Sequence, residues 1–305
     1  MGYTCPMRKA ANPVMKKLGL SDGDRAVIIH ADDIGMCQAG VEAFSDLHRA
    51  GIVSSGAVMV PCPWFLHAAS FSRENPKADL GIHLTITSEY QTYRWGPVST
   101  RDPASGLLDG EGCFPHRSAE VQDRGVPAAV GVELRAQVRM ALQAGIVPTH
   151  VDTHMGAVAS ARFLEHYVGV AAENGLPLMA FRSDEAGFRA AGLDAESAVI
   201  AARAMERLEA EGFPLLDNLA GMPLDRDEDR LACAKRALSG LPPGITHFII
   251  HPAKDGPEIR AIAKDWRYRT ADYATFLDED IGRHIASIGL HVIGYRDLKA
   301  LLPGR

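Results

Sequence analysis

The feature of this sequence that most constrains its fold is a repeated alternation of short apolar runs with longer stretches of helical periodicity. The first run, residues 25–30 (RAVIIH), is almost continuously apolar, as buried parallel strands are. Further runs predict strands at 53–60, 80–86, 150–152, 178–181, 213–217, 245–251 and 291–293. Helical spacing of apolar residues predicts helices at 37–49, 64–71, 128–144, 159–174, 196–212 and 227–239, and two more near 272–288. This alternation indicates a mostly parallel sheet with right-handed crossovers.

The length of 305 residues favours a closed or nearly closed (β/α) TIM-like barrel over an open doubly wound sheet. No glycine-rich dinucleotide-type turn follows the first strand, which weakens the nucleotide-binding alternative. We predict an N-terminal extension over residues 1–24 and a single barrel domain over residues 25–305. Two polar stretches, 88–127 and 254–269, are expected to be long loops with a functional role.

Bulk properties argue against several classes of partner. Proteins that bind nucleic acid usually carry a basic face, so the net charge of −6 argues against a nucleic-acid partner. The five cysteines are scattered and form no CxxC pair, so neither a disulfide framework nor a thiolate zinc site is expected. The N-terminus has no signal-like apolar run, and no window is long and apolar enough to span a membrane. We therefore expect a cytoplasmic protein without a membrane partner.

Two adjacent carboxylates, Asp32 and Asp33, follow the first apolar run. Burying such a pair is costly unless a cation or metal compensates it. At a strand end, with Gly35 allowing a turn, both could point into the C-terminal end of a barrel, where barrel enzymes place their reactive groups. The alternative is a capping aspartate beside a solvated one, which the apolar run before the pair makes less favourable.

Histidines mark further strand ends. His83 lies in the run GIHLTIT, where a core histidine is the alternative explanation. In THVDTH, the residues His150, Asp152 and His154 alternate and can face one side. His150 and His154 would lie about 13 Å apart along a strand, too far for both to bind one metal through bonds of about 2 Å. We predict that His154, at the strand exit, is the ligand, that Asp152 orients a neighbour and that His150 is structural.

The run THFIIHP repeats this pattern, with His247 near its start and His251 at its exit. His247 is expected to be structural. One carboxylate and two imidazoles form a suitable ligand set for a catalytic divalent ion. The predicted metal ligands are Asp33, His83 and His154. In the same scheme Asp32 is a general base that takes a proton from water, and His251 is an acid that protonates a leaving nitrogen.

These segments, in this order, resemble the YdjC-like carbohydrate deacetylase family, which includes chitooligosaccharide deacetylase and a hopanoid-associated relative. The resemblance rests on HADDIG, GIHLT, THVDTH and HPA, and it spans nearly the whole chain, residues 27–302. It implies a distorted (β/α) barrel, hydrolysis of N-acetyl groups on amino sugars, and the same ligands, base and late histidine as above. It also implies one divalent ion, often taken to be magnesium, although two imidazoles favour zinc or another transition metal.

This sequence departs from the family pattern at His30, Ile34 and residues 155–157, so the substrate need not be a chitin fragment. In the loop around residue 95, Arg94 and Trp95 are predicted to line the substrate site. The alternative is that Trp95 anchors the loop. Arg182 is a further predicted substrate ligand, with an ion pair as the alternative.

We expect an N-acetylated sugar as the partner, with a homodimer left open. A different metal hydrolase on the same barrel, such as a phosphodiesterase or a non-sugar amidohydrolase, is the second hypothesis, because fold and metal do not fix the substrate. A non-catalytic sugar-binding protein is the third. Neither the roles of His30, His150 and His247 nor the exact sugar follows from the sequence.

Overall fold

A computed structural model describes residues 11–226 and 228–303 of the chain, and it contains a sheet in which all pairings are parallel. The strands are β1 (Arg25–Ile34), β2 (Ser55–Val58), β3 (Leu80–Leu84), β4 (Val151–Thr153), β5 (Asn218–Gly221), β6 (Gly244–Ile250) and β7 (His291–Val292). Their order is β4-β3-β2-β1-β6-β5, with β7 beside the first residues of β1.

The sheet curls until its two edges meet through the short segment 177–182. Val151 of β4 forms a parallel bridge with Leu178, and Phe181 forms one with Leu216, just before β5. Main-chain hydrogen bonds join these positions, including Met179 N–H to the carbonyl of Val151 at 2.9 Å. A short strand predicted at 178–181 is thus reduced to isolated bridges. The prediction of a distorted, mostly parallel barrel is confirmed.

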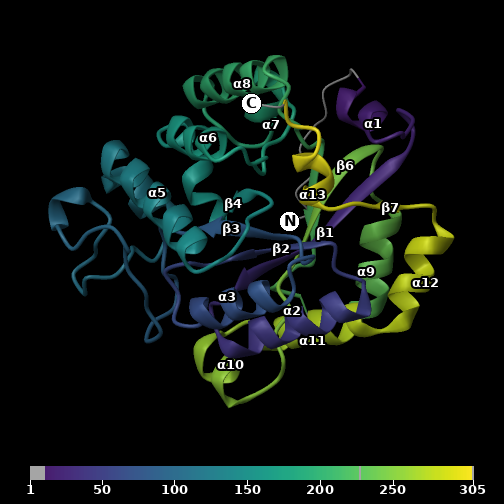
Figure 1. Cartoon of the computed structure of the whole chain (residues 1–305), viewed down its shortest axis with the longest axis horizontal. Helices are drawn as coiled ribbons and strands as arrows, with labels where there is room; N and C mark the ends of the chain where they lie inside the picture. The colour runs from purple at the N-terminus through teal and green to yellow at the C-terminus, as the bar shows by residue number, and fades with distance from the viewer. Residues whose placement is uncertain (1–10, 227, 304–305) are drawn as a thin grey trace.

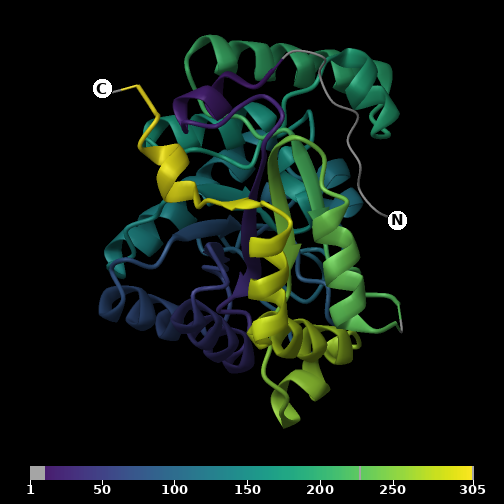
Figure 2. The same ribbon diagram turned by 90° about the vertical axis from the view of Figure 1, so that its right-hand side faces the viewer.

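Helices surround this barrel in Figure 1. They are α1 (Pro13–Lys17), α2 (Gln38–Ala50), α3 (Phe65–Glu74), α4 (Ser118–Arg124), α5 (Pro127–Gln143), α6 (Leu164–Glu173), α7 (Glu185–Ala190), α8 (Ala195–Ala210), α9 (Arg230–Ser239), α10 (Pro257–Ile262), α11 (Trp266–Leu277), α12 (Glu279–Ser287) and α13 (Tyr295–Lys299), with 3-10 segments at Pro103–Ser105 and His154–Ala159. The purple α1 and the green α8 lie at one end of the molecule and the yellow-green region of α10 at the other (Figure 2). The prediction of a loop over residues 254–269 is wrong, because α10 and the first turn of α11 lie in this stretch. Among the described residues, no helix has the length and apolar character needed to cross a membrane.

The two faces of β1 are buried in different surroundings. Val27, Ile29 and Ala31 belong to the large hydrophobic cluster that includes residues of the surrounding helices. Ala26 and Ile28 belong to a smaller cluster that also contains Tyr295 and buried residues of α1. Since successive side chains alternate across a strand, the face that carries Ala26 and Ile28 continues toward the carboxyl end as His30 and Asp32. The barrel is therefore apolar at its amino end and polar where the predicted site lies.

Candidate active site

The three predicted metal ligands converge at the carboxyl ends of three strands of the sheet, β1, β3 and β4. Asp33 comes from β1, His83 from β3, and His154 directly follows β4. Asp33 Oδ1 lies 3.2 Å from His154 Nδ1 and 3.5 Å from His83 Nε2. One ligand atom from each residue lies within 4.8 Å of the others, and all three residues are buried. The structure therefore brings together a carboxylate and two imidazoles from separate strands.

The backbone of β1 explains how adjacent aspartates reach the same space. The strand runs through Ile34, four residues past the predicted bound, and the two aspartates lie at its carboxyl end as expected. The register against β2 shifts between Ala31 and Ile34, and Asp33 has a φ of 61°. A left-handed residue within a bulge turns its side chain away from the regular alternation of a strand. Both carboxylates can then face the barrel interior, although a non-glycine residue pays a strain for this conformation.

The hydrogen bonds around the cluster leave the inward atoms of both rings free for an ion. His83 Nδ1 lies 2.9 Å from Asp152 Oδ1, and His154 Nε2 lies 3.0 Å from Glu89 Oε2. Each carboxylate can accept a hydrogen bond from its ring, and in the neutral rings His83 Nε2 and His154 Nδ1 then present lone pairs toward Asp33. Such an acceptor behind a metal-bound histidine is the usual way proteins fix its tautomer.

Only one of the two carboxylate oxygens of Asp33 accepts a hydrogen bond. Its Oδ2 accepts a hydrogen bond from Arg269 Nη1 at 2.7 Å, whereas its buried Oδ1 has no hydrogen-bond partner. An orphaned buried carboxylate oxygen beside two imidazole nitrogens is unfavourable unless a cation completes it. The donor set of one oxygen and two nitrogens suits a divalent transition metal or zinc. The buried Asp33, His83 and His154 cluster therefore fits a metal ion.

The electrostatic balance of the cluster depends on opposing effects. Burial acts to raise the pKa of Asp33, but the Arg269 guanidinium and the imidazole of His154 outweigh it and hold that pKa well below its ordinary value. Burial acts to lower the pKa of His154, but Glu89 and Asp33 outweigh it and raise the pKa to about 9. Without an ion, protons on the rings balance part of the negative charge, so a metal ion and protons would compete for these nitrogens.

The predicted base and acid lie beside this cluster. Asp32 Oδ2 is 3.8 Å from His83 Nε2 and 3.9 Å from His251 Nε2, and His251 directly follows β6. Burial acts to raise the pKa of Asp32, but the imidazoles of His83 and His30 outweigh it and hold that pKa below its ordinary value. The His251 side chain is 20% exposed, and its backbone N–H donates to Asp272 Oδ2 at 3.2 Å. The structure thus brings all five residues predicted for the chemistry to one place.

The residues predicted to bind substrate are held by other contacts. Trp95 is buried, and its indole N–H donates to the carbonyl of Thr87 at 2.7 Å. Arg94 forms an ion pair with Asp109 at 2.6 Å and a further one with Glu111. Both residues hold the loop that follows β3, and this loop also supplies Glu89 to the site.

Arg182 lies after the segment that closes the barrel. Its guanidinium forms ion pairs with Glu209 at 2.8 Å and Asp217 at 3.2 Å, and it donates to the carbonyl of Ala11. These contacts join α8, the residue before β5 and the N-terminal segment, and they do not include the ligand cluster. The substrate-binding roles of Arg94, Trp95 and Arg182 stay predictions.

Two residues of the site were absent from the sequence interpretation. Arg269 lies on α11, inside the stretch expected to be a loop, and 236 positions separate it from the aspartate that it contacts. Glu89 lies in the loop after β3, where a glutamate is ordinary. Neither carries a local sequence signal. The orienting role predicted for Asp152 agrees with its contact to His83.

The fold and the cluster define a class, a parallel (β/α) barrel whose buried aspartate and histidines at the carboxyl ends of the strands could hold a metal. The particular family follows from comparison with known proteins. The model of the YdjC-like protein family matches residues 26–287, and the chain belongs to this family.

Curated relatives and a solved structure agree with this assignment. A carbohydrate deacetylase of Thermus thermophilus is 32% identical over 95% of this chain and 99% of its own length. A carbohydrate deacetylase of Thermoanaerobacter pseudethanolicus is 22% identical over 90% of this chain and 99% of its own. A solved structure of an Enterococcus faecalis protein, whose name refers to cellobiose-phosphate cleavage, superposes with a TM-score of 0.74. It covers 90% of this chain and 99% of its own at 20% identity, which supports the shared fold.

Proposed function

We propose that this protein is a carbohydrate deacetylase that hydrolyses the N-acetyl group of an amino sugar with the help of one divalent metal ion. The family membership and the relatives named carbohydrate deacetylase support the activity and the class of substrate. The observation that carries the metal dependence is the orphaned Asp33 Oδ1, which faces two imidazole nitrogens whose opposite ring atoms are held by carboxylates.

In this proposal, Asp33, His83 and His154 hold the ion. When bound, the ion polarises the acetyl carbonyl and makes a water molecule more acidic. The three residues fix its position by approaching from separate strands. Arg269 keeps Asp33 ionised, and Asp152 accepts a hydrogen bond from Nδ1 of His83, which leaves the lone pair of the neutral ring on Nε2, so both residues act through the ligands that they touch.

Asp32 is the proposed general base. Its Oδ2 faces the cluster and its carboxyl is ionised at neutral pH, because the surrounding imidazoles keep the pKa low. It would take the proton of the attacking water as the water oxygen bonds to the acetyl carbon. His251, whose Nε2 faces the same carboxylate oxygen, would give a proton to the amine nitrogen as the C–N bond breaks. The products are acetate and a free amino sugar.

An acetate-release assay tests this function. Protein stripped by a chelator and then reloaded with zinc or magnesium is incubated with N-acetylglucosamine and its β-1,4 oligomers. We expect metal-dependent release of acetate from at least one of these sugars. Asp32→Asn should still bind the metal but lose turnover, because an amide cannot accept the proton. Near-normal turnover of Asp32→Asn would reject the base, and chelator-resistant activity would reject the metal.

A further inference from the structure

The two oxygens of Asp32 have different surroundings. Oδ1 accepts a hydrogen bond from His30 Nδ1 at 2.7 Å, whereas Oδ2 faces His83 and His251 across 3.8 and 3.9 Å. With one oxygen held from behind, rotation of the carboxylate is restricted and the other oxygen points at the ligand cluster. We infer that His30 is a positioning residue that aims Asp32 Oδ2 at the reacting centre, an inference that rests on the proposed function.

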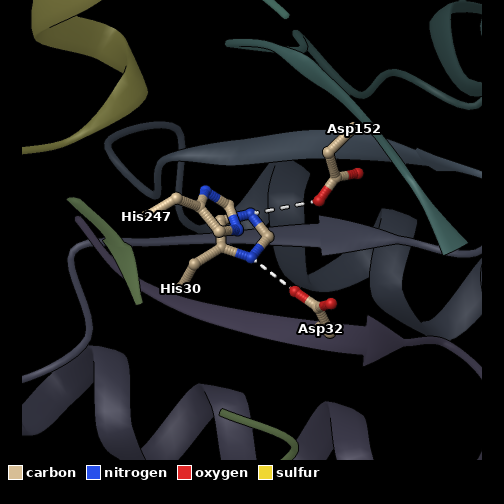
Figure 3. Close-up of side chains that lie close together, drawn as sticks. All are labelled: His30, Asp32, Asp152 and His247. Atoms are coloured by element: carbon tan, nitrogen blue, oxygen red, sulfur yellow. Dashed lines mark hydrogen bonds and ion pairs between the residues drawn. The ribbon is translucent and has the colours of Figure 1, made fainter. Parts of the chain in front are cut away.

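His30 is suited to this role because its ring is fixed on several sides. It is fully buried, and its second nitrogen, Nε2, lies 2.9 Å from Nε2 of His150. The ring of His247 packs against it with centroids 4.4 Å apart. Figure 3 shows the His30 ring between the two carboxylates, with Asp32 on one side and Asp152 on the other. Because the His30 ring is held at both nitrogens and across one face, its hydrogen bond to Asp32 Oδ1 fixes the orientation of that carboxylate.

The support continues into the barrel wall. His150 stacks on Tyr295 with centroids 3.7 Å apart, and its Nδ1 lies 3.0 Å from the hydroxyl of Thr149. Gly81 of β3 makes room for it, because a Cβ at this position would lie 2.4 Å from the His150 ring. The imidazole chain from His150 to His30 therefore connects the base to rigid strands on the far side of the interior.

The polarity of these hydrogen bonds is consistent with this role. Asp32 is an acceptor, so the proton between it and His30 belongs to Nδ1 of the ring. The contact between the two Nε2 atoms then needs one donor and one acceptor, which His150 and His30 can supply as opposite tautomers.

A second metal site is the competing interpretation of the same residues. One atom each of His30, Asp32, Asp152 and His247 lies within 4.8 Å of the others. Asp152 Oδ2 and His247 Nε2 have no hydrogen-bond partner, and Asp152 Oδ2 has only an ion-pair contact with His30 Nε2 at 3.5 Å (Figure 3). However, both nitrogens of His30 are already engaged, by Asp32 and by His150. Binding an ion would break one of these contacts, so we favour the positioning network and expect one zinc ion per chain.

Kinetics of His30 variants test the inference. His30→Ala removes the donor to Asp32, whereas His30→Asn keeps an N–H that can reach the same oxygen. His284→Asn is the control, because it removes a partly buried imidazole on α12 that contacts Ser239 and the carbonyl of Lys235 and lies outside this network. On the best N-acetylated sugar of the screen, we expect His30→Ala to lower kcat by roughly 10- to 100-fold with little change in KM. His30→Asn should recover most of this loss, and His284→Asn should retain kcat.

Zinc titration and crystallography give readouts that do not depend on turnover. His30→Ala should bind one zinc ion with wild-type affinity, since Asp152 rather than His30 holds His83. Crystal structures of zinc-loaded wild type and His30→Ala should show that the Asp32 carboxylate keeps its orientation only when the imidazole is present. An unchanged Asp32 in His30→Ala, an equal loss of kcat in His284→Asn, or two zinc ions per wild-type chain would overturn the inference. Absence of acetate release by wild type would instead reject the proposed function, while the crystal structures would still test the positioning.

Discussion

Replacing Asp152 by alanine should weaken metal binding while the fold persists. Asp152 is buried, and its Oδ1 lies 2.9 Å from Nδ1 of His83. Without this acceptor the His83 ring can adopt the tautomer that places a proton on Nε2, the atom facing Asp33. Loss of such an orienting carboxylate costs roughly 10- to 100-fold in metal affinity, or about 1.4 to 2.7 kcal/mol. Asp152→Asn should lose less, since an amide oxygen can still accept from Nδ1.

Competition of the protein with a chromophoric chelator for zinc measures this affinity directly, and circular dichroism checks that each variant is folded. Asp217→Asn is the matched control. Asp217 is also a buried carboxylate, but it contacts Arg182 and Asn12 beside the start of β5. We expect this variant to lose stability and to keep its affinity for zinc. Wild-type zinc affinity in a folded Asp152→Ala protein would refute the argument that Asp152 fixes the tautomer of His83.

Three further expectations concern stability. Arg94→Met removes the buried ion pair between Arg94 and Asp109, so it should lower the free energy of unfolding by about 2 to 3 kcal/mol. The loop after β3 should also become sensitive to protease. An unchanged rate of cleavage in this loop would contradict the expectation. Burial raises the pKa of Asp79 in the folded state. Its contribution to the free energy of unfolding is therefore complete below about pH 4 and is lost as the pH rises through the folded-state pKa. Urea unfolding over a pH series should show that Asp79→Asn removes this dependence of the free energy of unfolding on pH. Gly81→Ala should cost about 1 to 3 kcal/mol by overpacking, and His150→Ala in the same chain should reduce this penalty if the clash is with that ring.

The alternation of strands and helices was predictable because it depends on local hydrophobic periodicity. The first strand and the helix after it lie within a few residues of the predicted bounds, and Gly51 ends that helix in a left-handed conformation. The convergence of Asp33, His83 and His154 followed from one geometric rule, that the carboxyl ends of parallel strands meet at one end of a barrel.

The details that tune the site were not predictable from local pattern. The bulge at Asp33 depends on how β1 pairs with β2, and no residue type at that position signals it. Arg269 and Glu89 reach the site from segments whose composition is ordinary for loops and helix ends. The interior histidines carried a periodic signal, but their partners are set by packing between strands far apart in the sequence. His30 is the clearest example, because its second nitrogen contacts a residue 120 positions away.

The closure of the barrel by isolated bridges at Leu178 and Phe181 divides its wall into two mechanically different parts. The ligands come from β1, β3 and β4, where ladders of several residue pairs join each strand to its neighbour, interrupted between β1 and β2 by the bulge at Asp33. Between β4 and β5, the wall depends on a few backbone amides. Local opening should therefore begin at that seam, and hydrogen exchange there should outpace exchange in β1. The wall between β4 and β5 can therefore open locally while the strands that carry Asp33, His83 and His154 keep their relative positions.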